Sequence, residues 1–416
     1  MDKLLKFIPK EYKEKINFFL FAIIIFILTF FLYQQYAYLL GRKNIDLTQW
    51  DWLAKSFLQG KLYLPSPPST WDLTSFQGHW YVPEPPLPAI LMLPLVILVG
   101  NVNTVLFSIF FSALNSMLLF MILYQLSHLG WINTSITGII WLVILFAFGT
   151  PHWWVGMNGR VWYVSQIVAI TFVALAVLSA ILSWSPWLVG LFLGMAIFSR
   201  PNVILIWPLL FAIAAQLWKD NNKQFQTKLL VRWTIKTIIP IGIFVAGLFF
   251  YNYLRFRNIF DFGYGTINGN PPLVEAVRKY GMFSPHFISQ NLYVMFLKLP
   301  VISLVKPYLD ITSCLGISIF ITTPAFLYLI HRYENKIWII GAWVSAILSL
   351  GILSLYSSSG QVQFGYRYIL DLIIPVMILM AVSINRKIPW FLLLLIIFSI
   401  AINEYGAFWI IKYIGG

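Results

Sequence analysis

An all-α, polytopic membrane protein is the fold class that the sequence predicts, and two features of the 416-residue chain predict it. Hydrophobic residues make up 60% of the chain and charged residues only 10%, whereas soluble domains have about 25% charged residues. Apolar stretches recur from end to end, and in hydrocarbon they must be helical because lipid offers no partners to backbone N–H and C=O groups. The single cysteine, Cys314, excludes an intrachain disulfide. We therefore expect one membrane domain over residues 1–416.

The first apolar run, residues 16–38, follows a basic N-terminal segment, residues 1–15, that holds five lysines. The run is longer than the 7–15 residues of a signal-peptide core, and no small-residue cleavage site follows it. It is therefore expected to remain in the membrane as the first span. Positively charged flanks stay in the cytoplasm, so the loop at residues 39–86 is predicted to lie outside.

Further apolar segments raise the expected number of transmembrane helices to about 11–12. They cover residues 87–100, 104–126, 134–150, 162–182, 186–199, 202–217, 233–253, 313–330, 337–355, 367–384 and 389–411. Basic clusters at 219–236, 332–336 and 386–387 indicate cytoplasmic loops, which places residues 254–312 and 356–366 outside. An interfacial helix is predicted at 287–309, where two lysines and a proline interrupt an apolar stretch.

The number of segments before Lys219 is one too many for the N-terminus and the 219–236 loop to share a side. One of these segments must therefore fail to cross the membrane. Residues 87–100 are short and contain Pro88 and Pro94, and proline disrupts a helix interior. We expect this segment to be the one that does not cross.

The first half of the first outer loop has helical periodicity. Apolar side chains share one face and polar side chains another: Trp50, Leu53, Phe57 and Leu58 against Asp51, Lys55 and Gln59. The pattern is typical of an amphipathic helix that lies on the membrane and ends at Gly60. Asp46, three residues before Gln49, is spaced as a helix cap, and Asp51 and Lys55 are spaced as an i,i+4 ion pair.

The second half of this loop, residues 69–88, is rich in prolines and aromatic residues. Prolines forbid a continuous helix, and flat aromatic rings suit a sugar or the headgroup level of a membrane. The residues that we expect to contact a sugar or an acceptor are Trp50, Trp80, Tyr81, Glu84 and His79. Asp72 is also placed to form a local turn with Ser69. His79 has no second histidine at ligand spacing, so a packed or solvated role is favoured over a metal site.

The loop contains Asp46, Trp50, Ala54, Leu58 and Gly60 in that order, and then a Tyr-x-Pro-x-Pro-Pro-Leu motif that opens residues 81–100. This arrangement resembles the opening loop of the GT-C glycosyltransferases, which include protein O-mannosyltransferases and the aminoarabinose transferases of lipid A. Residues 194–201, 251–264 and 365–368 resemble segments of uncharacterised bacterial members of the same fold. The resemblance implies a GT-C-like bundle and places the catalytic acid at Asp46.

The implied reaction needs a carboxylate, because an acceptor hydroxyl must lose a proton as it attacks the anomeric carbon and displaces a lipid phosphate with inversion. The sequence departs from the resemblance in two ways. Glu84 stands where the aminoarabinose transferases have a lysine before Pro-Pro-Leu, and the spacing from Asp46 to Gly60 is one residue short. Asp51 and Asp72 therefore remain alternative catalytic acids.

Arginines are the expected ligands of the lipid phosphate, because guanidinium forms bidentate bonds and stays protonated. The candidates lie on outer loops or at the edges of spans: Arg255, Arg257, Arg367, Arg200 and Arg160. An alternative role for Arg367 is an ion pair with Asp371 one helical turn later. Arg200 lies in an apolar region where a charge is costly, which favours a functional role.

These patterns predict an inverting glycosyltransferase in a bacterial cytoplasmic membrane, with its active site outside. Its partners would be a polyprenyl-phosphate-linked sugar, membrane lipid and an acceptor that the sequence does not identify; nucleic acid is not expected. No cofactor is expected, and a divalent cation is less favoured than arginine alone. The alternatives are a lipid or sugar transporter or flippase, for which we find few ionisable residues within the spans, and a catalytically inactive membrane scaffold.

Overall fold

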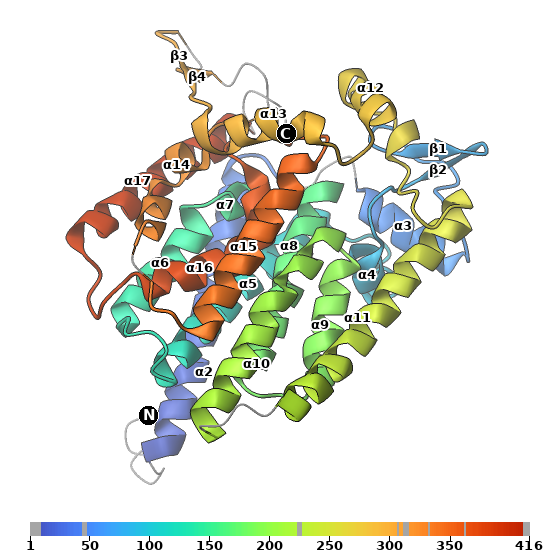
Figure 1. Cartoon of the computed structure of the whole chain (residues 1–416). Helices are drawn as coiled ribbons and strands as arrows, with labels where there is room; N and C mark the ends of the chain where they lie inside the picture. Colours follow the sequence, from blue (N-terminus) through green and yellow to red (C-terminus); the bar gives the residue numbers. More distant parts are fainter. Residues whose placement is uncertain are drawn as a thin grey trace.

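The computed structural model describes residues 10–43, 48–222, 227–305, 308–310, 316–331, 333–361 and 363–410. Asp46, Lys306 and Cys314 fall outside these ranges. The described residues form a bundle of helices (Figure 1), with β-structure confined to two short antiparallel hairpins. The prediction of an all-α polytopic membrane protein is thus confirmed at the level of fold class.

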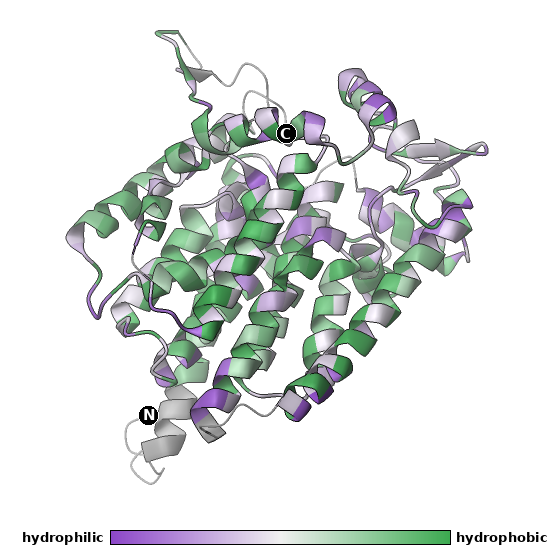
Figure 2. Ribbon diagram, in the orientation of Figure 1, coloured by the Kyte–Doolittle hydropathy of each residue, from purple (hydrophilic) through white to green (hydrophobic). Residues whose placement is uncertain are grey.

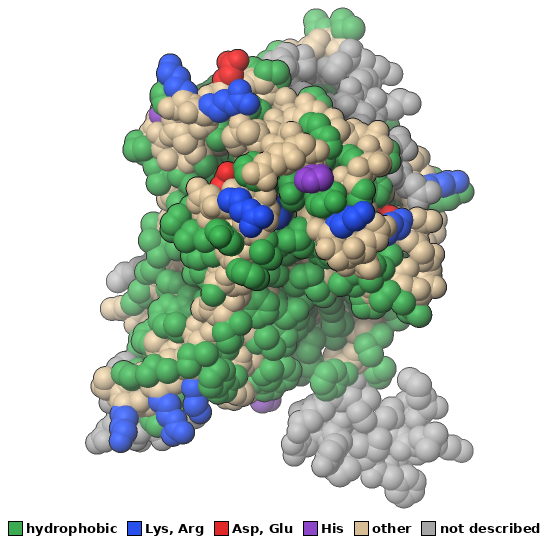
Figure 3. Space-filling model, turned by 90° about the vertical axis from the view of Figure 1, so that its right-hand side faces the viewer, with side chains coloured by type: hydrophobic (Ala, Val, Ile, Leu, Met, Phe, Trp, Pro, Cys, Tyr) green, Lys and Arg blue, Asp and Glu red, His purple; other side chains and the backbone are tan. Residues whose placement is uncertain are grey.

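Seven helices in the described part of the chain are long and apolar enough to cross a bilayer. They are α2 (Lys10–Leu39), α5 (Thr104–His128), α8 (Val161–Ile181), η1 with α10 (Pro201–Ile206 and Trp207–Asn222), α11 (Thr227–Phe256), α15 (Ile337–Leu355) and α17 (Trp390–Trp409). Hydrophobic residues fill the middle of the bundle in Figure 2. Figure 3 shows the same feature on one face as a broad apolar belt, with Lys and Arg side chains above and below it.

The expected count of about 11–12 transmembrane helices exceeds the seven long apolar helices of the described residues, because the remaining apolar segments form shorter or divided helices. The helices α4 (Leu87–Val99), α6 (Ile136–Phe148) and α9 (Pro186–Ile197) have 12 or 13 residues. Their length of about 20 Å is below the roughly 30 Å of a hydrocarbon core. Two other predicted spans are divided into α14 (Ile319–Thr322) with η5 (Pro324–Leu329), and η6 (Arg367–Leu372) with α16 (Ile373–Val382).

The helix α8 forms the centre of the bundle, where it packs against α5, α9 and α10. Nearly all of its residues are buried. On the outer side of α9, glycines allow α11 to approach closely: a Cβ atom on Gly194 would lie 2.3 Å from the Phe244 ring. This close packing fixes the end of α9, which leads directly into Arg200.

The predicted amphipathic helix of the first outer loop is present as α3 (Gln49–Leu58), and much of its apolar face is covered by protein. Trp50, Leu53 and Ala54 are fully buried, and α3 packs against α4. Most of its apolar face therefore contacts protein, while Leu58 is exposed. The second half of the loop forms a hairpin of β1 (Thr74–Phe76) and β2 (His79–Tyr81). Gln77 and Gly78 connect the strands with positive φ angles, as a two-residue hairpin turn requires.

The helix α4 begins and ends on the half of the molecule that carries α3 and the β1–β2 hairpin (Figure 1). At its start, the Leu87 N–H donates to the Phe198 carbonyl at 3.1 Å. At its end, Asn101 accepts a hydrogen bond from Lys55 of α3 at 2.5 Å. The following residue, Asn103, caps α5 and donates to the Lys43 carbonyl, just beyond the end of α2. The chain thus returns to the same side, which removes the surplus crossing before Lys219.

The segment 254–312, which the sequence predicts to lie outside and which we call the second outer loop, carries α12 (Pro271–Tyr280), α13 (Ile288–Leu292) and the π-helical turn η4 (Tyr293–Leu297). The hairpin of β3 (Val301–Ile302) and β4 (Leu309–Asp310) follows. The predicted interfacial helix at 287–309 is therefore shorter than expected, because it ends before Pro300 and a hairpin follows. These elements lie at the same end of the bundle as α3 (Figure 1). We call this end the site end, and the end with the α10–α11 connection the opposite end.

Cysteine labelling tests the path of α4. In a Cys314→Ser background, we expect His79→Cys and Asn101→Cys to react with a membrane-impermeant maleimide from one side of sealed vesicles, and Lys219→Cys from the other. All three residues are exposed, so access limits none of them. Labelling of His79→Cys and Asn101→Cys from opposite sides would show that α4 crosses the membrane.

Candidate functional site

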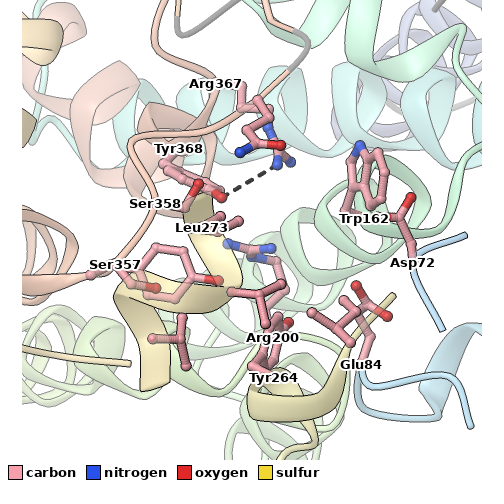
Figure 4. A pocket seen from close by; sticks show the side chains of 15 residues that line it. Asp72, Glu84, Trp162, Arg200, Tyr264, Leu273, Ser357, Ser358, Arg367 and Tyr368 are labelled. Carbon is pink, nitrogen blue, oxygen red and sulfur yellow. Dashed lines mark hydrogen bonds between the residues drawn. The ribbon is translucent and has the colours of Figure 1, made fainter. Parts of the chain in front are cut away.

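A cavity opens at the site end between the first outer loop, α12 and the ends of several transmembrane segments. Its empty volume is about 750 Å³, including its opening. Figure 4 shows its polar lining: Asp72 and Glu84 lie on one side, and the guanidinium groups of Arg200 and Arg367 with Tyr368 lie on the other. The α12 side chains that line it are apolar: Leu273, Val274 and Val277. The cavity thus separates carboxyl groups from guanidinium groups beneath an apolar cover.

Asp72 enters the cavity from an unusual backbone conformation, with φ at +61°. Asp is among the few residues that tolerate this region, and such conformations concentrate at functional sites. The conformation is held by a hydrogen bond from the Asp72 N–H to the Asn268 carbonyl at 2.7 Å. Its Oδ2 atom is buried without a hydrogen-bond partner among the described residues. Asp72 also lies in a local turn, as predicted, but the turn is closed by the Leu73 N–H and the Thr70 carbonyl at 3.1 Å, while Ser69 Oγ accepts from the Trp71 N–H at 3.2 Å.

Glu84 lies in the Pro-rich segment before α4 and is 7% exposed. Its Oε2 atom is also buried without a hydrogen-bond partner in the described part of the chain. Burial raises the pKa of Glu84 to about 7, against the lowering effect of Arg200, Arg255 and Arg367. Burial and the charge of Glu84 raise the pKa of Asp72 to about 8, although Arg160 and Arg367 oppose this shift. Carboxyl groups with such values can exchange protons near neutral pH.

Arg200 is held by a buried ion pair with Asp371, with Nη2 and Oδ2 2.8 Å apart. Asp371 also accepts hydrogen bonds from Asn202 and Gln166, each at 2.8 Å. The guanidinium of Arg200 lies 5.4 Å from the centre of the Tyr368 ring, and its Nε atom is buried without a hydrogen-bond partner among the described residues. The ion pair therefore fixes the guanidinium and leaves a donor available.

Arg367 does not form the predicted pair with Asp371, because Arg200 occupies that carboxylate. It donates to Tyr368 Oη at 3.3 Å and to Gln166 Oε1 at 3.5 Å. Its guanidinium packs on the rings of Tyr163 and Tyr368, at 5.1 and 4.6 Å from their centres. Its Nε atom likewise lacks a partner among the described residues. These direct contacts are all to neutral groups, so among the described residues the carboxyl groups of Asp72 and Glu84 interact with Arg367 only at longer range.

A second cavity of about 660 Å³ adjoins the first. Four residues line both: Glu84, Arg200, Tyr264 and Tyr356. The rest of its wall is mainly apolar and includes Pro201, Phe262, Met282, Phe283, Ile352 and Leu353. We call the four shared residues the junction. The two cavities together offer a polar compartment, a charged junction and an apolar compartment.

Of the predicted catalytic acids, the structure brings Asp72 into the cavity and keeps Asp51 out of it. Asp51 forms the predicted ion pair with Lys55 at 2.6 Å and accepts a hydrogen bond from the Val102 N–H at 2.8 Å. These contacts join α3 to the end of α4, which is a structural role. Asp46 lies outside the described residues.

Asp51→Ala tests this assignment. The substitution leaves the buried Val102 N–H unsatisfied, so we expect the free energy of unfolding to fall by about 1–3 kcal/mol. The midpoint of thermal unfolding in detergent should decrease, while the turnover rate per folded molecule remains that of the wild type. A selective loss of turnover without loss of stability would return Asp51 to the catalytic candidates.

The predicted phosphate ligands fall into two groups, those at or near the cavity and those away from it. Arg200 and Arg367 line the cavity, and Arg160, at the start of α8, is close enough to lower the pKa of Asp72. Arg255 is fully buried behind the cavity, where it donates to the Val82 carbonyl at 2.5 Å and stacks on Tyr251. Arg257 is exposed outside it. Arg255 thus supports the segment that carries Glu84 and does not reach the cavity.

Of the predicted sugar or acceptor contacts, only Glu84 lines either cavity. Trp50 is fully buried and donates to the Val161 carbonyl at 2.8 Å. His79 is exposed and stacks on Tyr63, while Tyr81 packs edge-on against Phe256. Trp80 lies in β2 and packs against the core. These aromatic side chains therefore lie outside both cavities, and a contact between them and a sugar or an acceptor stays a prediction.

The aromatic residues that line the first cavity are instead Trp162, Tyr264, Tyr356 and Tyr368. Two of them, Tyr264 and Tyr368, lie in the segments 251–264 and 365–368 that the sequence analysis singled out, but nothing in their spacing distinguishes them from core residues. Gln166 and Asp371 orient the two arginines. Each is a polar residue in an otherwise apolar run. A polar residue in an apolar run is the sequence signal that could have identified these two positions.

Among the described residues, no group of three or more His, Cys, Asp or Glu side chains is arranged to hold a metal ion. Comparison with known proteins adds no further assignment, since no family model, no curated protein and no solved structure matches the chain.

Proposed function

We propose that this protein is an inverting glycosyltransferase that moves a sugar from a polyprenyl-phosphate donor to an acceptor at the site end of the membrane. One observation carries the proposal: a polar cavity with carboxyl groups facing two oriented guanidinium groups adjoins an apolar cavity across a charged junction. A lipid-linked sugar phosphate has the same order of parts, namely a polar sugar, an anionic phosphate and an apolar chain.

Arg200 and Arg367 would bind the phosphate in this proposal. Their Nε atoms lack hydrogen-bond partners in the described part of the chain, and arginine is suited to phosphate because its planar fork matches the phosphate oxygens. The ion pair with Asp371 and the hydrogen bonds of Gln166 hold the guanidinium groups in place before a ligand arrives. Such preorganised charges stabilise a leaving phosphate at low reorganisation cost.

Asp72 would accept the proton of the acceptor hydroxyl. In a single displacement, the nucleophile enters on the face of the sugar opposite the leaving group. Asp72 lies across the cavity from the two guanidinium groups (Figure 4), so a sugar between them would have its base and its leaving phosphate on opposite faces. The new bond forms between the acceptor oxygen and the anomeric carbon as the carbon–oxygen bond to phosphate breaks.

The sidedness of the site follows from basic residues at the opposite end. Lys219, Lys228, Arg232 and Lys236 flank the connection between α10 and α11, and Arg386 lies beside the start of α6, where its carbonyl accepts from the Ser135 N–H. Positively charged loops are retained in the cytoplasm. We therefore propose that the opposite end is cytoplasmic and the cavity opens outside, in the cytoplasmic membrane of a bacterium.

A transfer assay tests the function. Detergent-purified protein is incubated with radiolabelled polyprenyl-phosphate glucose, mannose or galactose and a membrane extract as the acceptor source. We expect label to pass from one donor to a new product, and Glu275→Gln, on the exposed face of α12, to behave as the wild type. Parallel assays of Asp46→Asn and Asp72→Asn distinguish the two candidate bases. If the protein neither binds nor consumes any of the donors, the proposal fails and a transport role becomes the better interpretation.

A further inference from the structure

Glu84 is the acidic residue at the junction of the two cavities, and its surroundings fix its position. It lies between Pro83 and Pro85 in a segment that is buried throughout, and proline restricts the backbone on either side. The buried guanidinium of Arg255 holds the Val82 carbonyl two residues before it. The carboxyl group is therefore held at the junction by the protein and does not depend on a ligand for its placement.

The junction is where the phosphate of a lipid-linked donor would lie, because the polar and apolar cavities meet there. Glu84 shares this place with Arg200, while Asp72 lines only the polar cavity. An ionised carboxylate beside a phosphate would repel it in a buried setting where charges are weakly screened. A protonated carboxyl group would instead donate a hydrogen bond to a phosphate oxygen. The unpartnered Oε2 atom is the atom available for that bond.

We propose that Glu84 is a second catalytic residue, a general acid that gives its proton to the leaving phosphate. This inference rests on the proposed glycosyl transfer. As the acceptor oxygen bonds to the anomeric carbon, the acceptor proton passes to Asp72 and the carbon–oxygen bond to phosphate breaks. The proton of Glu84 passes to a phosphate oxygen, so the lipid phosphate leaves as a monoanion. Transfer of a proton from Asp72 to Glu84, which both line the polar cavity, restores the starting state.

The protonation of this pair depends on the charged and titratable groups around Glu84. Those that interact with it are Asp72, Arg200, Arg255, Arg367, Tyr251, Tyr264 and Tyr356. Burial raises the pKa of Glu84 to about 7 and that of Asp72 to about 8. The pair accordingly carries two protons below about pH 7, one in the interval between these values and none above about pH 8. These values place the single proton mainly on Asp72, whereas the reaction requires the minor one-proton form in which Glu84 is protonated and Asp72 is ionised. Pairs with two protons or none lack this form, so kcat/KM should follow a bell-shaped pH profile.

Glu84→Gln tests the inference, because glutamine retains the shape and a hydrogen-bond donor but has no proton to transfer. We expect transfer from the ordinary donor to slow by about 10²-fold. The alkaline limb of the pH profile should also disappear, because no acid remains to be deprotonated. The acid limb should remain, because it reports the ionisation of Asp72 while Glu84 is still protonated, and glutamine is likewise neutral.

A donor analogue separates acid catalysis from a structural role. In this analogue a difluoromethylene group replaces the oxygen between phosphorus and lipid, which makes the leaving phosphonate a weaker base with less need for a proton. Glu84→Gln should lose much less activity with the analogue than with the ordinary donor, whereas Asp72→Asn should lose the same factor with both. Glu275→Gln serves as the matched control on the exposed face of α12.

The outcomes are distinguishable. If the wild type transfers from neither donor, the proposed function fails. If the wild type is active but Glu84→Gln matches it, or loses the same factor with both donors, the acid role of Glu84 is overturned. Gel filtration and thermal unfolding show whether Glu84→Gln is folded. If it is not, Glu84→Asp provides the same comparison, because a shorter acid should also lose more activity with the ordinary donor than with the analogue.

Discussion

Asp72→Asn should reduce the rate of sugar transfer by about 10²- to 10⁴-fold, the usual effect of losing a general base. Asparagine is close in size and tolerates the positive φ angle at this position, so the midpoint of thermal unfolding should change little. The loss should appear in kcat more than in KM, because Asp72 lies across the cavity from the guanidinium groups that bind the donor phosphate.

The pH dependence gives an independent check on Asp72. Burial raises the pKa of its carboxyl group to about 8, and the base acts only when ionised. The wild-type kcat/KM should therefore decrease on the acid side of the profile, approaching tenfold for each pH unit. The residual activity of Asp72→Asn should lack this dependence. A variant that keeps the acid limb and most of its activity would show that Asp72 is not the base, and Asp46→Asn would then become the decisive variant.

Asp371→Asn should destabilise the protein and weaken donor binding together. Asp371 is buried and neutralises Arg200 through the 2.8 Å contact. Loss of one partner of a buried ion pair leaves an uncompensated charge and costs about 3–5 kcal/mol. Because Asp371 also orients Gln166, which contacts Arg367, both proposed phosphate ligands lose a support. We expect a lower midpoint of thermal unfolding and a KM for the donor at least tenfold higher.

The double variant Arg200→Met/Asp371→Leu separates the two effects. Replacing a buried ion pair by apolar side chains of similar volume is often neutral or stabilising. The double variant should therefore regain much of the wild-type unfolding temperature without regaining donor affinity. Recovery of donor affinity along with stability would mean that Arg200 has a structural role and does not bind the phosphate.

The composition and local patterns of the chain were sufficient to predict the fold class and contacts between residues that are close in the sequence. A chain with 60% hydrophobic and 10% charged residues must be helical in lipid, because lipid satisfies no backbone hydrogen bonds. The Asp51–Lys55 pair was predictable for the same local reason, since residues four apart on a helix are neighbours. The path of α4 was only partly predictable: short length and prolines indicated a segment that does not cross, but its return to α3 depends on contacts made by Lys55 and Asn101.

The sequence identified Asp72, Glu84, Arg200 and Arg367 as separate candidates, and only the tertiary structure brought them together in one cavity. They come from three segments spread over almost 300 residues, namely the first outer loop, the start of η1 and the start of η6, and no spacing rule connects these segments. Arg255 and Arg367 look alike in the sequence, yet one is buried behind the cavity and the other lines it. Trp50 and Trp162 are both tryptophans, yet Trp50 is buried in the core and only Trp162 of the two lines the cavity. Sequence periodicity describes the faces of one helix, whereas the site depends on which faces of different helices meet.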